Sequence, residues 1–278
     1  MINVQTIKFS YKDKSTKVFE DLCFQLEQNR VYGLLGENGT GKSTLLYLLM
    51  GLLRPCEGQI TVDGVNVSSR QRETLQQMYI VPEEFDLPAM RFTDYVEAYR
   101  PFYPNFSDEI LCHCMEEFHL PLDAQLNRLS MGNKKKALMS FALATNVPLL
   151  FMDEPTNGMD IPSKSQFRKV IALGMSDERS IIISTHQVRD LESMIDRVLL
   201  LHDNTMILNE SVIDIARKLE FIRTTSKDDL QGCIYSTFTP DGFVGVRPNM
   251  NDVDTTVDLE TLFNSVVTNP LAIKQLFV

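Results

Sequence analysis

Short apolar runs separated by polar, glycine-rich or acidic segments recur along the first 200 or so residues of the chain. Runs of apolar and β-branched residues indicate buried strands, because a strand covered on both faces shows little alternation. Strands are predicted at residues 3–9, 22–26, 31–35, 57–64, 78–82, 147–152, 180–186 and 198–201. Because helical segments lie between many of these strands, the pattern predicts an α/β fold.

Helical segments are recognised by apolar spacing and by capping residues at their starts. Ser107 and Ser130 both have N-cap chemistry, and a buried stripe follows Ser130 at residues 137, 138, 141, 142 and 145. Residues 83–127 are rich in aromatics, prolines and acids, and we interpret them as an inserted helical lobe. Helices are predicted at residues 44–50, 93–100, 107–118, 130–144, 162–173 and 187–194.

The pattern changes from about Glu220 onward. Residues 232–238 and 243–246 are predicted to be strands joined at Pro240-Asp241-Gly242, which is a hairpin signal, and residues 257–266 are predicted to be helical. No catalytic cluster is visible there. We interpret this part as a small appended element for regulation or packing.

One glycine-rich segment fits the phosphate-binding pattern G-x-x-x-x-G-K-[ST] at every fixed position: Gly36-Glu37-Asn38-Gly39-Thr40-Gly41-Lys42-Ser43. A predicted buried strand precedes it and a predicted buried helix follows it. Glycines let backbone N–H groups curl around phosphate oxygens, and the helix N-terminus adds a positive dipole end. Lys42 would reach the outer phosphates, and the Ser43 hydroxyl would bind magnesium.

Three ionisable residues stand at the carboxyl ends of predicted strands, where open α/β sheets place their ligands. Asp153 is a candidate magnesium ligand, and Glu154 is a candidate general base for an attacking water. The alternative is a strand that simply ends in polar residues. His186 ends the next strand in the same way and is a candidate contact for a γ-phosphate.

Two clusters have simpler interpretations. Lys134, Lys135 and Lys136 lie near the start of a predicted helix, where cations oppose the helix dipole and an arriving anion would relieve the cost. The alternative is a solvated basic face, and for the lysines alone we favour it. Cys112 and Cys114 flank a histidine, but alternate helical residues point to different faces, so packing is favoured over metal binding.

Composition narrows the function classes. The formal net charge of −10 argues against a general nucleic-acid binder. The longest apolar runs, at residues 45–53 and 147–152, are too short to cross a bilayer, and no signal stretch opens the chain. With five scattered cysteines, we expect a cytoplasmic protein that touches a membrane only through a partner.

Over roughly residues 1–215, the chain resembles the ATP-binding cassette subunit of ABC transporters. The resemblance implies that Tyr11 stacks on adenine, and that residues 36–43 are the Walker A loop, with Thr44 after it. Leu129-Ser130-Met131-Gly132-Asn133 is similar to the signature sequence, of which Ser130 and Gly132 would face the γ-phosphate. Walker B with its catalytic glutamate, the D-loop and the switch histidine correspond to residues 149–154, residues 158–160 with Asp160, and His186.

The resemblance implies a P-loop NTPase (RecA-like) core with an N-terminal antiparallel β subdomain and an inserted helical subdomain at about residues 84–145. Residues 216–278 would form a C-terminal extension. ATP and Mg²⁺ would be the cofactors, with Ser43, Asp153 and Glu83 on the metal. Two cassettes would close head-to-tail on two ATP molecules and drive an integral membrane permease, on the inner face of the cell membrane and without nucleic acid. The short cassette and an ending like Asp258-Leu259-Glu260-Thr261-Leu262-Phe263 resemble cassettes that are paired with two-component exporter permeases in bacteria.

Two residues depart from the family pattern. The signature sequence usually ends in glutamine, where this chain has Asn133; little loss is expected. At Glu83 the family usually has a glutamine that contacts magnesium and the attacking water. Glu83 can still bind magnesium, but it adds negative charge beside a triphosphate and cannot donate a hydrogen bond when ionised.

Two other functions compete. A soluble ABC-type ATPase acting in DNA repair or on the ribosome would share the same motifs. Against it stand the single cassette, the lack of a long heptad insertion and zinc pairs, and the acidic net charge. A P-loop kinase would leave Ser130 and His186 unexplained.

Overall fold

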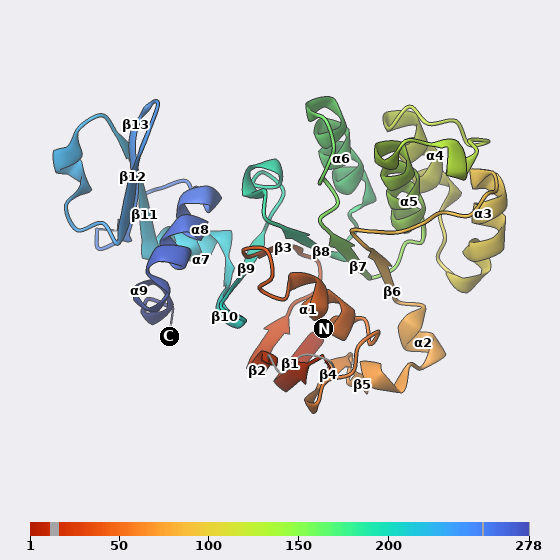
Figure 1. Ribbon diagram of the computed structural model, residues 1–278, viewed down its shortest axis with the longest axis horizontal. Coiled ribbons are helices and arrows are strands. Elements are labelled where there is room, and N and C mark those ends of the chain that lie inside the picture. The colour runs from red at the N-terminus through yellow and green to blue at the C-terminus, as the bar shows by residue number, and fades with distance from the viewer. Residues whose placement is uncertain (12–16, 252, 278) are drawn as a thin grey trace.

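The computed structural model describes residues 1–11, 17–251 and 253–277. A central sheet lies between an antiparallel sheet, a helical lobe and a C-terminal lobe (Figure 1). The α/β expectation is confirmed. Within the described residues, no helix combines the length and apolar character needed to span a membrane.

The central sheet has six strands in the order β10-β9-β3-β8-β7-β6. Its five parallel strands form where strands were predicted, whereas the antiparallel edge strand β10 was not predicted. Alternate residues of β8 enter different cores: Ile182 packs on the antiparallel-sheet side, and Ile181 and Ile183 pack on the helical side. The strands are β3 (Val31–Leu35), β6 (Met78–Val81), β7 (Leu149–Asp153), β8 (Ser180–Thr185), β9 (Arg197–His202) and β10 (Thr205–Ser211).

The second, antiparallel sheet covers α1 (Lys42–Leu49) and has the order β2-β1-β4-β5. The predicted Asp-Gly turn joins β4 to β5, and both Asp63 and Gly64 have the positive φ that such a turn requires. The strands are β1 (Ile2–Ser10), β2 (Lys17–Leu26), β4 (Glu57–Val62) and β5 (Val65–Asn66).

The helical lobe contains no strand among its described residues, as predicted. The predicted caps are confirmed: the Ser107 hydroxyl accepts a hydrogen bond from the N–H of Ile110, and that of Ser130 accepts one from the N–H of Asn133. Cys114 is buried and Cys112 is exposed, in keeping with the packing interpretation. The lobe and its flanks comprise α2 (Arg72–Leu75), α3 (Phe92–Tyr99), α4 (Asp108–Glu117), α5 (Met131–Ala144) and α6 (Ile161–Gly174).

The prediction of a helix at residues 187–194 was wrong. Only a 3₁₀ turn, Val188–Asp190, forms there, and it continues into turns with i→i+3 hydrogen bonds. The 3₁₀ geometry places Val188 and Leu191, three residues apart, on one face, and both side chains are buried. The Lys164 ammonium of α6 bonds the Gln187 amide oxygen and the Asp190 carboxylate of the same segment, at 2.9 and 2.6 Å.

The C-terminal lobe has the predicted hairpin, β12 (Tyr235–Thr239) with β13 (Gly242–Pro248), and the predicted helix α8 (Leu259–Thr268). Three elements were not predicted: α7 (Val212–Lys218), β11 (Leu219–Thr224) and α9 (Pro270–Gln275). The lobe shares the hydrophobic core of the helical side of the cassette. The Glu192 carboxylate also accepts a hydrogen bond from the N–H of Leu259, at the start of α8.

Candidate functional site

The glycine-rich loop connects β3 to α1 and has a backbone that side chains would not allow. Gly41, the residue before α1, has a φ of 94°, and a Cβ there would lie 2.8 Å from the Phe19 ring. A Cβ at Gly36 would lie 2.6 Å from the Thr40 hydroxyl. No acidic residue stands in the first turn of α1 and no side chain caps it. The free N–H groups of this helix end therefore suit an anion.

A cavity of about 710 Å³ opens in front of this loop, a size that suits a nucleotide. Segments far apart in the sequence converge on it, among them the start of α1, Glu83 in the segment after β6, and the residues that directly follow β7 and β8. Its walls are Tyr11, Lys17, Val18, Asn38, Gly39, Gly41, Lys42, Ser43, Thr44, Glu83, Glu154, Asn157, His186 and Asn204.

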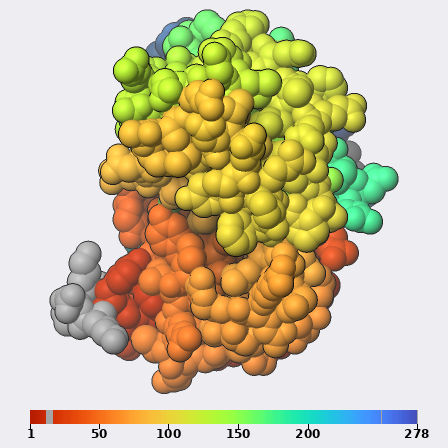
Figure 2. Space-filling view, turned by 90° about the vertical axis from the view of Figure 1, so that its right-hand side faces the viewer, coloured from red at the N-terminus to blue at the C-terminus, as the bar shows by residue number. Residues whose placement is uncertain are grey.

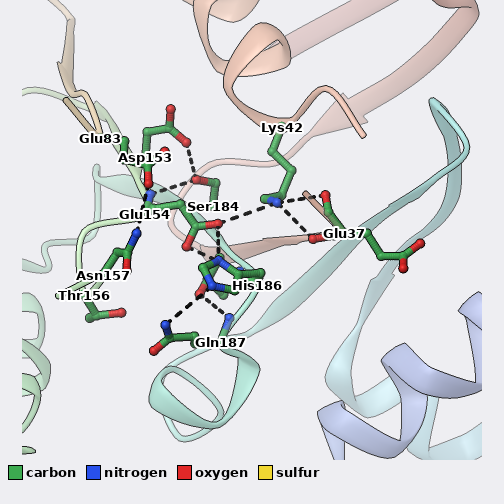
Figure 3. Close-up of polar contacts among 12 residues, drawn as sticks. Glu37, Lys42, Glu83, Asp153, Glu154, Thr156, Asn157, Ser184, His186 and Gln187 are labelled. Atoms are coloured by element: carbon green, nitrogen blue, oxygen red, sulfur yellow. Dashed lines mark hydrogen bonds and ion pairs between the residues drawn. The ribbon is translucent and has the colours of Figure 1, made fainter. Parts of the chain in front are cut away.

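The Lys42 ammonium is buried and folds back over its own loop (Figure 3). It donates hydrogen bonds to the carbonyl oxygens of Gly36 and Glu37, at 2.9 and 3.1 Å. It also lies 3.6 Å from Oε1 of Glu154. The one cation of the loop thus faces the carboxylate expected to act as the base.

Glu154 lies at the centre of the polar contacts in Figure 3. Its backbone N–H donates to the hydroxyl of Ser184 at 2.9 Å, and its Oε1 lies 3.0 Å from Nδ1 of His186. Within the described residues, Oε1 is buried and accepts no hydrogen bond. An acceptor of this kind, at the wall of a polar cavity, suits a carboxylate that takes a proton from water.

Of the expected magnesium ligands, Ser43 and Glu83 line the same cavity, and Asp153 directly precedes Glu154, which also lines it. Asp153 is buried and accepts a hydrogen bond from the Ser184 hydroxyl, and Glu83 accepts one from the amide of Asn157 at 3.0 Å. Ser43, Asp153 and Glu83 offer only oxygen atoms, which fit Mg²⁺. Among the described residues no group of three or more His, Cys, Asp or Glu side chains could hold a metal. A magnesium ion here would therefore share its coordination with phosphate and water.

Tyr11 lies at the rim of the cavity and is 37% exposed. Its hydroxyl is 3.0 Å from the Thr44 hydroxyl, and its ring stands edge-on to Phe9. This arrangement leaves an aromatic surface at the mouth of the cavity.

Three expected nucleotide contacts outside the phosphate loop do not line the cavity of their own chain. Ser130 is exposed, and a Cβ on Gly132 would meet no atom within 4 Å. Asp160 is also exposed and caps α6 by accepting a hydrogen bond from the N–H of Ser163. Hydrogen bonding with the side chain of Ser163, and then with its N–H, lowers the pKa of the Asp160 carboxyl below its usual range.

The interpretation of the three lysines as a solvated basic face was wrong for two of them. Lys135 and Lys136 are buried, 6% and 9% exposed, because α5 is enclosed over most of its length. Lys135 was missed as a residue of the site, as were Asn157 and Ser184. The sequence signal for Asn157 was its place three residues after Glu154; Lys135 offered none, since the charge run masked it.

A family model described as ABC transporter matches residues 19–157, which is half of the chain. The chain belongs to the ABC transporter family. As a member of it, the chain binds ATP and is an ATPase, and its fold is the P-loop NTPase fold that the sequence predicted.

Relatives extend the match beyond the family model. The ATP-binding protein YtrB of Bacillus subtilis is 27% identical over 74% of this chain and 70% of its own length. The Nod factor export ATP-binding protein I of Neorhizobium galegae is 28% identical over 94% of this chain and 74% of its own. A dimeric post-hydrolysis ATP-binding cassette with ADP and phosphate has the same fold, with a TM-score of 0.66, 21% identity and coverage of 76% and 98%.

Proposed function

We propose that the chain is the nucleotide-binding subunit of an ABC exporter and hydrolyses Mg-ATP in the cavity beside α1. The convergence of the phosphate loop, Glu83, Glu154 and His186 on one cavity supports this most strongly. The loop N–H groups and Lys42 would bind the phosphates. Glu154 would take the proton of the attacking water, and His186, 3.0 Å from its carboxylate, would orient that carboxylate toward the γ-phosphate.

Magnesium would supply positive charge against the phosphates. Ser43, Asp153 and Glu83 would hold it, and the hydrogen bond from Ser184 would fix the Asp153 carboxylate in place. Tyr11, at the rim, would stack on the adenine, a contact worth roughly 1–3 kcal/mol.

A second cassette would complete the site. Ser130 and Gly132 stand at an open helix end, beside Met131, which is 56% exposed. Such a surface suits the γ-phosphate held by another copy, with Asp160 at the same interface. The dimeric cassette that shares this fold supports the arrangement.

A groove beside the helical lobe is a candidate docking site for the permease. Figure 2 shows this face, with the lobe in yellow above and the segment with α2 in orange below. The groove holds about 350 Å³, and Phe102 beside it is 61% exposed. Arg70 and Arg72 line it, together with Leu75, Gln76 and Tyr103. The chain would then lie on the inner face of the cell membrane, held there by its partner.

Export rather than import rests on the relatives. The match with the Nod factor export protein covers 94% of the chain, so it reaches past residue 215 into the C-terminal extension. We divide the chain into a cassette, residues 1–215, and an extension, residues 216–278, because the extension forms a sheet of its own, β11-β13-β12.

The first experiment measures the oligomeric state of Glu154→Gln by light scattering after size exclusion, with and without Mg-ATP. A monomer that becomes a dimer only with Mg-ATP is the expected result. A protein that stays monomeric in detergent-solubilised complex with its membrane partner would contradict the shared site. Co-purification with ribosomes or DNA instead of a membrane protein would favour the soluble ABC-type ATPase.

A further inference from the structure

Lys135 is a buried cation in the second turn of α5, and its side chain is directed at the segment after β7 rather than at solvent. Its ammonium donates hydrogen bonds to the backbone oxygens of Asn157, at 3.0 Å, and Glu154, at 3.3 Å. Over the described residues, no carboxylate lies within ion-pair distance of this ammonium. A buried charge without a direct partner is costly, so its surroundings need an explanation.

The surroundings of Lys135 are acidic. Burial lowers the pKa of the Lys135 ammonium, whereas the nearby carboxylates of Glu83, Glu154 and Asp153 raise it. Asn157 joins two of these groups, since its amide donates to Glu83 at 3.0 Å and its carbonyl accepts from Lys135. A hydrogen-bonded chain therefore runs from Glu83 through Asn157 to Lys135 and on to the backbone of Glu154.

The bond to Glu154 meets a strained residue. Glu154 has a φ of 44°, a left-handed conformation that costs a non-glycine residue roughly 1–2 kcal/mol. Its N–H is held by Ser184 and its carbonyl by Lys135. Both peptides of this residue are thus fixed, and that fixes the direction in which its side chain leaves the backbone.

We propose that Lys135 is a positioning residue for hydrolysis, whose charge balances Glu83 and whose hydrogen bonds hold the backbone of Glu154. The inference rests on the proposed hydrolytic function. A site that binds polyphosphate and already contains Glu154 and Asp153 gains a further negative charge from Glu83. Lys135 offsets that charge from inside the protein, without occupying the cavity.

A double-mutant cycle tests this: Lys135→Gln, Glu83→Gln and both together. We expect Lys135→Gln to lower kcat at least tenfold when residue 83 is glutamate, and less than threefold in the Glu83→Gln background. A second readout is the dissociation constant for ATP in EDTA. We expect Lys135→Gln alone to weaken this binding at least threefold and the double variant to return to about the wild-type value, because the double variant has the same net charge as the wild type.

Lys136 provides the matched control. It is as buried as Lys135 and lies next to it, but its ammonium bonds Gln166 at 2.9 Å and lies over the Phe118 ring, 5.6 Å from the centroid. We expect Lys136→Gln to lower the thermal midpoint and to have the same effect on kcat and on ATP binding with either residue at position 83.

The proposal would be overturned if Lys135→Gln lowered kcat equally with glutamate and with glutamine at position 83, or if the double variant bound ATP as weakly as Lys135→Gln alone. If Lys135→Gln alone does not fold, a double variant that regains the wild-type melting midpoint supports the charge balance, and one that stays unfolded overturns it. The two proposals fail differently. If the wild type does not hydrolyse ATP, the proposed hydrolytic function is wrong. If it does, but the effects of the two substitutions on kcat simply add, only the role proposed for Lys135 is wrong.

Discussion

The N-terminal ends of α1 and α5 are similar in sequence character and opposite in surroundings. Both helices lack acids in the first turn, and both carry lysine near that end. The start of α1 lines a cavity with Lys42 buried, whereas the start of α5 leaves Ser130 exposed at the surface. One helix end therefore has its ligand cavity within the chain, and the other presents its N–H groups outward.

The difference lies in how each helix begins. Gly41 has a positive φ and no side chain, so it cannot cap the first N–H groups of α1. Ser130 caps its own helix through the N–H of Asn133. A helix end capped by its own side chain is stable before any ligand binds. This supports the view that α1 binds the phosphates first and that α5 reaches them only from a second copy.

The position of α5 depends on Arg179, so replacing this residue tests how firmly the helix is held. Arg179 is 1% exposed and donates hydrogen bonds to the carbonyl oxygens of Leu143, Val147 and Gly174, which lie at or just beyond the C-terminal ends of α5 and α6. We expect Arg179→Met to lower the free energy of unfolding by about 3 kcal/mol, because buried carbonyls lose a charged donor. Urea denaturation measures it. Arg189→Met, which breaks only an exposed pair with Glu260, should cost less than about 1 kcal/mol.

The α1 half of the comparison depends on Glu154. We expect Glu154→Gln to slow steady-state phosphate release at least ~100-fold, the low end for loss of a general base, or about 2.7 kcal/mol of barrier. ATP binding, measured by equilibrium dialysis, should persist because Lys42 and the loop are untouched. Near-normal turnover would remove Glu154 from the role of base.

The α5 half can be tested by mixing inactive variants. Ser130→Glu places a negative charge where a γ-phosphate would bind, and Lys42→Ala removes the phosphate-binding cation; each alone should lose at least tenfold in turnover. In a head-to-tail dimer, the mixed pair keeps one intact site, so an equal mixture should regain roughly a quarter of wild-type activity. No recovery in the mixture would mean that both helix ends act within one chain.

The smallest effect is expected at Glu83. Glu83→Gln keeps the shape of the side chain and removes a charge, so turnover should stay within about tenfold of the wild type, one decade being 1.4 kcal/mol. Magnesium titration of the ATPase rate checks it. A collapse of activity would mean that the carboxylate itself is needed on the metal.

Local signals predicted much of the site. The phosphate loop, the caps of Ser107 and Ser130 and the polar ends of β7 and β8 depend on neighbouring residues, and each lies where the sequence placed it. Two predictions failed because they depend on residues distant in the sequence. The core takes up Val188 and Leu191 from a 3₁₀ turn rather than from the predicted helix, and the packing around α5 buries Lys135.

The sequence by itself determined the chemistry of the phosphate loop, because its glycine φ angles and its helix N-terminus are properties of one short segment. The tertiary structure alone decided which charges share the site. Glu83, Lys135 and Glu154 come from three elements, and their distances depend on the parallel order of β6 and β7 and the packing of α5 against them. The structure also decided that Ser130 faces outward, since exposure depends on everything packed around a residue.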